Sequence, residues 1–74
     1  MTNSRVAYLA NQIAANFAAQ GHDTAVADIA DHLQKFWEPR MRRALLALVA
    51  SGGHGLDDLV IAAAARLEQS PGHV

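Results

Sequence analysis

The chain has 74 residues, with 6 Lys and Arg against 7 Asp and Glu, a formal net charge of -1 and a pI near 6.4. This length gives room for a single domain, and the near-neutral balance excludes the general basic excess with which many proteins hold nucleic acid. The sequence has no Cys, which excludes disulfides, thiolate metal sites and a cysteine nucleophile.

Alanine is abundant and proline occurs only at positions 39 and 71, so the composition favours helix throughout residues 1–74. The longest apolar runs, ALLALVA and LVIAAAA, are far shorter than the roughly 20 residues that span a bilayer. The first twelve residues, MTNSRVAYLANQ, lack the uninterrupted apolar stretch of a secretory signal. We therefore expect a cytoplasmic all-α domain without a membrane partner.

A first helix is predicted over residues 4–20, ended by Gly21 in the left-handed conformation common at helix C-termini. Its large apolar residues recur at helical spacing and form the expected core stripe: Val6, Leu9, Ile13 and Phe17.

The opposite side of this helix is unusual because no Asp, Glu, Lys or Arg occurs between Arg5 and Asp23. The residues there are Tyr8, Asn11, Gln12, Ala15, Ala18 and Ala19. A solvated helix face normally carries Lys and Glu. Two interpretations stay open: an alanine-rich exposed face, or a surface that contacts another helix, either of a partner or of a second copy when the chain is isolated.

A second helix is predicted over residues 24–36, with Asp23 or Thr24 as its N-cap. Its expected buried residues are Val26, Ile29, Ala30, Leu33 and Phe36. Its far side carries Asp28, Asp31 and Lys35, and Asp31 and Lys35 have the i,i+4 spacing of an ion pair.

A third helix is predicted over residues 39–51, because proline suits the first helical position and glycine at 52 suits the position after the last. Its expected core residues are Met41, Leu45 and Leu48, with Ala44 beside them. Arg42 projects among Leu45, Leu46 and Val49, where an arginine either snorkels or belongs to an interface.

A fourth helix is predicted over residues 57–69, with Asp57 as N-cap and Leu56 and Ile61 as a hydrophobic staple. We expect it to face inward through Leu59, Val60, Ala63 and Leu67, and outward through Arg66 and Glu68. The last five residues, 70–74, are expected to be frayed. Together the segments predict a compact bundle of four short helices.

The stretch FWEPRMRR places three arginines, Arg40, Arg42 and Arg43, in the first turns of the third helix. The helix dipole disfavours cations there by roughly 0.3–1 kcal/mol each. Trp and Arg are the residues most enriched in interface hot spots, so we predict that Trp37 and the arginines contact a partner protein. The alternatives are that Trp37 covers the core while the arginines are solvated, or that the basic helix binds nucleic acid, which the nearby acids disfavour.

No catalytic, cofactor-binding or metal-binding residue is predicted. Asp28 and His32 could supply two metal ligands at i,i+4, but no third is suitably spaced. The GGHG segment lacks the strand, Lys and Ser or Thr of a phosphate loop and is expected to be a turn. No serine has an evident base, so we do not expect the chain to be an enzyme by itself.

Three segments resemble the delta subunit of cytosolic NAD-dependent formate dehydrogenases: LANQIAANFAA, HLQKFWEPRMRRALLA and GLDDLVIAA. The most specific parts are Ala-Asn-Gln-Ile at 10–13 and Phe-Trp-Glu-Pro-Arg-Met at 36–41. Two positions depart from the family pattern, since Met is more usual than Leu9 and Pro is expected where Asp58 stands.

The resemblance implies a non-catalytic accessory of an oxidoreductase complex. Its large subunits would hold a molybdenum bis-pterin cofactor, iron–sulfur clusters and FMN, oxidise formate to carbon dioxide and pass electrons to NAD. The small chain would carry none of these groups and would support assembly or stability. The residues that match the family motifs are Asn11, Gln12, Trp37, Pro39, Arg40 and Met41; we assign Pro39 to the helix start, Met41 to the core and the others to contact surfaces.

Three hypotheses therefore stay open. The chain is a permanent subunit bound to the large subunits of formate dehydrogenase, or an assembly factor that helps insert the molybdenum cofactor and then leaves, or a small helical regulator that binds nucleic acid. The third is the least favoured.

Overall fold

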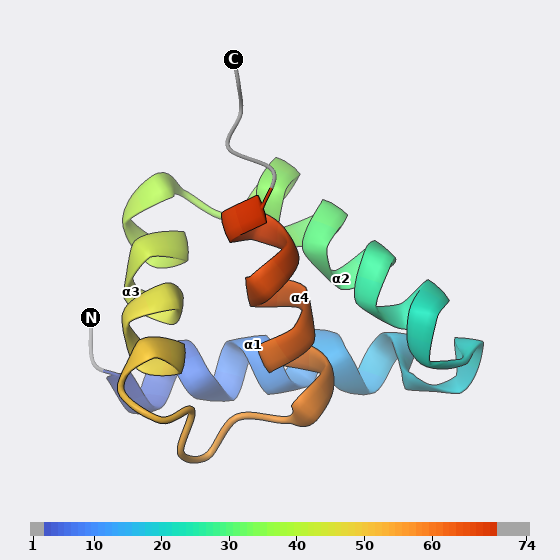
Figure 1. Ribbon diagram of the computed structural model, residues 1–74, viewed down its shortest axis with the longest axis horizontal. Coiled ribbons are helices and arrows are strands. Elements are labelled where there is room, and N and C mark those ends of the chain that lie inside the picture. Colours follow the sequence, from blue (N-terminus) through green and yellow to red (C-terminus); the bar gives the residue numbers. More distant parts are fainter. Residues whose placement is uncertain (1–2, 70–74) are drawn as a thin grey trace.

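The computed structural model describes residues 3–69 and confirms an all-α fold with four helices in that range (Figure 1). The elements are α1 (Asn3–Phe17), the short 3₁₀ helix η1 (Ala18–Gln20), α2 (His22–Phe36), α3 (Pro39–Ala50) and α4 (Asp58–Gln69). The predicted fraying concerns residues 70–74, which lie outside the described residues. The predicted outward position of Glu68 concerns a side chain that is likewise not described.

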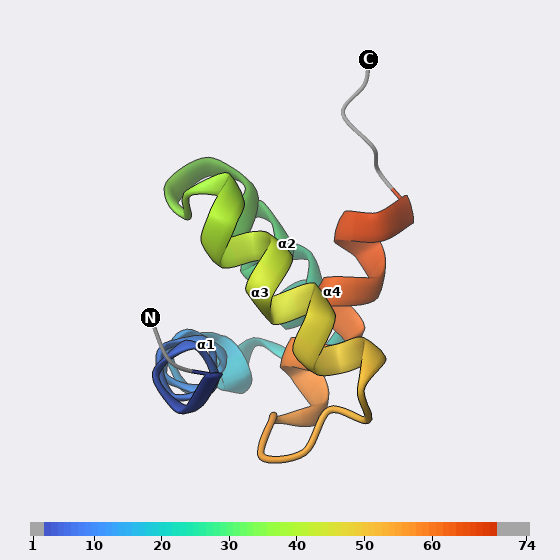
Figure 2. The ribbon, with the colours of Figure 1, turned by 90° about the vertical axis from the view of Figure 1, so that its left-hand side faces the viewer.

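The helices do not run parallel to one another. α1 crosses the lower ends of α3 and α4, while α4 packs mainly against α2 (Figure 1). In a view turned by 90°, α4 lies on one side of the molecule, and α1 and the junction between α2 and α3 lie on the other (Figure 2).

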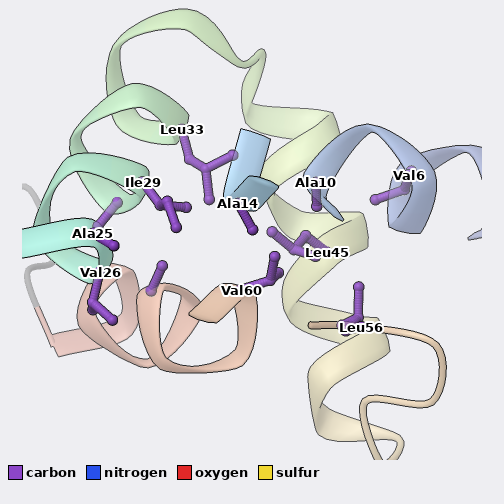
Figure 3. Packing of buried hydrophobic residues seen from close by; sticks show 12 residues of the cluster. Val6, Ala10, Ala14, Ala25, Val26, Ile29, Leu33, Leu45, Leu56 and Val60 are labelled. Carbon is purple, nitrogen blue, oxygen red and sulfur yellow. The ribbon is translucent and has the colours of Figure 1, made fainter. Parts of the chain in front are cut away.

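The core is small and rich in alanine. Four side chains in it, Ile29, Leu33, Leu45 and Val60, are 0% exposed and converge from α2, α3 and α4 (Figure 3). The remaining members of the buried cluster are Val6, Ala10, Ala14, Ala25, Val26, Ala30, Leu56 and Ala63. Because alanine has almost no side chain, the helices that contribute it can approach closely.

The predicted core stripe of α1 is partly wrong. Val6 is buried as expected, but Leu9, Ile13 and Phe17 are only partly buried. Ala10 and Ala14 are each 1% exposed in their place. Both stripes have helical spacing, so periodicity could not separate them; the close approach of α1 to its neighbours selects the small residues.

The turn between α1 and α2 also differs from the prediction. Gly21 has a positive φ of 92°, but its ψ of 153° is not left-handed helical. α2 begins at His22, two residues before the predicted start at Thr24, and neither Asp23 nor Thr24 caps it through its side chain. The η1 turn tightens the end of α1, so the chain reverses at Gly21 in a conformation open essentially only to glycine.

Within α2, four of the five predicted core residues are buried: Val26, Ile29, Ala30 and Leu33. The prediction for Phe36 is wrong, since this side chain is 71% exposed. Phe36 is the last residue of α2, and its ring lies 4.8 Å from that of His32. The predicted ion pair is confirmed, with Lys35 Nζ 3.2 Å from Asp31 Oδ2.

The end of α3 confirms the predicted role of Gly52. The Gly53 N–H donates to the Leu48 carbonyl at 2.9 Å and the Gly52 N–H to the Val49 carbonyl at 3.1 Å, the two bonds of a Schellman motif. A Cβ on the buried Gly53, whose φ is +69°, would lie 3.0 Å from Ile61 Cδ1. Pro39 is the first residue of α3 as predicted, and Leu45 is its fully buried residue, whereas Met41 and Leu48 are partly buried.

The start of α4 confirms Asp57 as N-cap. Its Oδ1 accepts the Leu59 N–H at 2.9 Å, and its carbonyl accepts the Val60 N–H at 2.9 Å. Val60 and Ala63 are buried as predicted, Leu59 and Leu67 are partly buried, and Arg66 is exposed.

Candidate protein-interaction surface

The described residues contain no group of three or more His, Asp or Glu that could hold a metal ion. The ring of His32 instead lies between two phenylalanines, 4.8 Å from Phe36 and 6.4 Å from Phe17. None of the helices described here is both long and apolar enough to cross a membrane. The side chains that the sequence predicts as contacts differ in the contacts that they make within the fold.

The Arg42 side chain is bound inside the fold. Its Nη1 donates to the carbonyl oxygens of Gln34 at 3.2 Å and Leu33 at 3.4 Å, and also to that of Trp37. These carbonyls lie at the end of α2, where the helix dipole favours a cation. The Leu33 carbonyl also accepts the Trp37 N–H at 3.2 Å, whereas the Gln34 carbonyl lies in the last turn, which lacks intrahelical donors. Arg42 thus caps α2 although it belongs to the first turn of α3, an intramolecular role that sequence reasoning did not foresee.

Arg40 and Arg43 have no such role. Both are exposed, and neither forms a hydrogen bond or ion pair with another described residue. α3 contains no acidic residue that could pair with them. Arg40 borders a surface hollow with Glu38, Met41 and Ala44. The fold leaves these two cations available for an external acidic group.

The position of Trp37 is compatible with both predicted roles, which are to cover the core and to contact a partner. Its side chain is partly buried and packs against the core, and its carbonyl accepts the hydrogen bond from Arg42. It therefore fixes the α2–α3 junction and presents only part of its indole to the surface.

The predicted contact residues of α1 also divide into two groups. The Asn11 side chain binds the glycine-rich loop: its Nδ2 donates to the Gly55 carbonyl at 2.8 Å, and its Oδ1 accepts the Asp57 N–H at 2.9 Å. Asn11 thereby holds the segment that carries the N-cap of α4. Gln12 is exposed, and Tyr8 is 59% exposed, so these two side chains remain available for contact.

Phe36 is the surface residue that sequence reasoning missed. Its spacing of three residues from Leu33 and seven from Ile29 predicts a core position. The available signal was its position as the last residue before Trp37-Glu38-Pro39, where the helix ends. At that point a helical residue can extend past the elements that would cover it.

Comparison with protein families identifies the chain. The family described as "NADH-dependant formate dehydrogenase delta subunit FdsD" matches residues 5–64, a span that contains both free arginines, Asn11 and Phe36. Neither the comparison with curated proteins nor that with solved structures gave a match.

Proposed function

The chain belongs to the family of NADH-dependent formate dehydrogenase delta subunits, and we propose that it is a non-catalytic subunit that binds the larger subunits of the enzyme and supports their assembly or stability. Family membership confirms the resemblance predicted from the motifs at 10–13 and 36–41. The match over residues 5–64 is the observation that carries the proposal.

The surface supports a binding role. Arg40 and Arg43 are cations at the unfavourable end of α3, without a partner among the described residues. Carboxylates on a larger subunit would pair with them. Tyr8, Gln12 and part of Trp37 are further exposed residues of the predicted set, whereas Asn11 and Arg42 act mainly within the fold.

We propose that the molybdenum bis-pterin cofactor, the iron–sulfur clusters and FMN belong to the larger subunits. This chain does not fit an iron–sulfur cluster, because such clusters are held by cysteine thiolates and the sequence has no Cys. No step of formate oxidation is therefore assigned to its residues. We propose a cytoplasmic location for the complex.

A second candidate function is that of an assembly factor that leaves after the molybdenum cofactor has been inserted. The two free arginines support this second candidate, because guanidinium groups bind phosphate well and could contact a phosphate group of the cofactor. A nucleic-acid-binding role loses support, because the internal role of Arg42 reduces the basic cluster to Arg40 and Arg43.

Expression of the larger subunits with and without this chain tests the proposal. A permanent subunit remains in the purified enzyme at fixed stoichiometry and lengthens the half-life of activity at elevated temperature. An assembly factor raises the molybdenum content while leaving the purified enzyme without the chain. If composition, half-life and molybdenum content are all unchanged, the proposed function is wrong.

A further inference from the structure

The largest apolar residues of α1 are those that the fold leaves partly exposed. Leu9, Ile13 and Phe17 follow one another at intervals of four residues, so they form one line along the helix. Ile13 and Phe17 rest against the edge of the core, and Leu9 does not belong to the packed cluster. A monomer would gain more by burying these residues than by burying Ala10 and Ala14.

The line continues from α1 onto α2 through aromatic rings. The ring of Phe17 lies 6.4 Å from that of His32, which lies 4.8 Å from that of Phe36. Phe36 is 71% exposed, the larger of the two values for exposed large hydrophobic residues in the described chain. We refer to Leu9, Ile13, Phe17, His32 and Phe36 as the apolar strip.

The α2 residues of the apolar strip, His32 and Phe36, lie away from the hollow between α2 and α4. The α2 residues that line this hollow are Ala27, Ala30, Asp31 and Gln34. At about 100° per residue, His32 and Phe36 lie roughly 150–170° around the helix axis from the mean direction of those four. α1 and the α2–α3 junction lie together on the side of the molecule opposite α4 (Figure 2), and Phe36, which ends α2 next to that junction, is 71% exposed.

The free arginines lie within reach of the same interface. Arg40 is four positions after Phe36 in the chain, so their Cα atoms are at most about 15 Å apart. Arg43 lies about one helical turn beyond Arg40. A standard interface covers about 800 Å² on each partner and is therefore about 30 Å across. An apolar centre with cations at its edge is the usual anatomy of such a patch.

We propose that the apolar strip is the docking surface for a larger formate dehydrogenase subunit, which presents an apolar patch edged by carboxylates to Arg40 and Arg43. This inference rests on the proposed function. It assigns the centre of the contact to Phe36 and the strip, and not to the uncharged face of α1 that carries Tyr8 and Gln12. In a two-fold symmetric dimer, the same patch of each copy faces that of the other. A second copy would then offer the two arginines only one acidic residue at the α2–α3 junction, Glu38.

Binding of the isolated chain to the larger subunits, measured by titration for the wild type, Phe36→Ser and Tyr8→Ser, tests this inference. The two variants remove exposed aromatic rings of similar size from different faces of the molecule. Phe36→Ser should raise the Kd at least about 10-fold, as expected for a hot-spot aromatic, whereas Tyr8→Ser should change it less than about 3-fold. Circular dichroism establishes that each variant retains its helicity, and Leu9→Gln provides a second substitution in the strip.

The charged edge is tested with the double variant Arg40→Gln/Arg43→Gln against Arg66→Gln, a control on the exposed side of α4. The double variant should weaken binding and flatten its dependence on ionic strength, while the control should leave both unchanged.

Each other outcome overturns the inference. If folded Phe36→Ser and Leu9→Gln bind like the wild type, or if Tyr8→Ser weakens binding as much as they do, the strip is not the docking centre. If the isolated chain forms a dimer that Phe36→Ser dissociates while binding to the larger subunits is unchanged, the strip serves self-association. If the wild type does not bind the larger subunits at all, it is the proposed function that fails.

Discussion

Replacing Asn11 by Ala removes two hydrogen bonds between α1 and the loop that precedes α4. The amide donates to the Gly55 carbonyl at 2.8 Å and accepts the Asp57 N–H at 2.9 Å. These contacts join residues 44 and 46 positions apart in the chain, so no local structure replaces them. We therefore expect Asn11→Ala to destabilise the fold although Asn11 is only partly buried.

The size of the effect follows from three terms. Two hydrogen bonds contribute roughly 1–3 kcal/mol in total, toward the lower end where water can reach the groups. Alanine in a helix interior recovers up to about 0.7 kcal/mol of helix propensity. The expected loss is about 1–2 kcal/mol in a chain whose total stability is roughly 4–11 kcal/mol, which lowers the Tm by about 4–16 °C.

Thermal and urea unfolding followed by circular dichroism measures this loss. Asn16→Ala is the matched control, because Asn16 is exposed on the same helix and forms no hydrogen bond with a described residue. The control should keep or slightly raise the Tm. Equal Tm values for the two variants would refute the reasoning that Asn11 holds the loop.

Three further substitutions test other internal contacts by urea unfolding. Arg42→Gln should cost about 1–2 kcal/mol because it uncaps the end of α2, while Arg43→Gln should cost less than about 0.5 kcal/mol; equal losses would contradict the assigned cap. Asp57→Ala should cost about 1 kcal/mol through loss of the N-cap of α4, and no loss would show that the capping bond is dispensable. Gly53→Ala should cost about 1–3 kcal/mol, because the backbone is left-handed there and the added methyl meets a neighbouring side chain; an unchanged midpoint would contradict that strain.

The helices could be predicted from sequence because each has a local signal at its ends. Pro39 and Gly52 bound α3, and Asp57 begins α4, as the structure confirms. The start of α2 was predicted less well, since Asp23 and Thr24 both have the chemistry of an N-cap but the helix after η1 already starts at His22, two residues before the predicted Thr24. That choice depends on how the chain reverses at Gly21, which no single residue type encodes.

The orientation of α1 could not be predicted in the same way. Its large apolar residues and its alanines both have helical spacing, and burial of the alanines depends on how closely α2, α3 and α4 approach. The roles of Asn11 and Arg42 were missed for a related reason. Their partners lie in other elements, so only the tertiary structure shows that two predicted contact residues are used within the fold.

The most direct test of the central claim is native mass spectrometry, after size exclusion, of this chain mixed with formate dehydrogenase larger subunits prepared without it. A bound subunit should give a co-eluting complex of fixed stoichiometry, retained by the Asn16→Ala control and weakened by Phe36→Ser. Separate elution of the folded wild-type chain, with no complex detected at any mixing ratio, would contradict a role as a bound subunit.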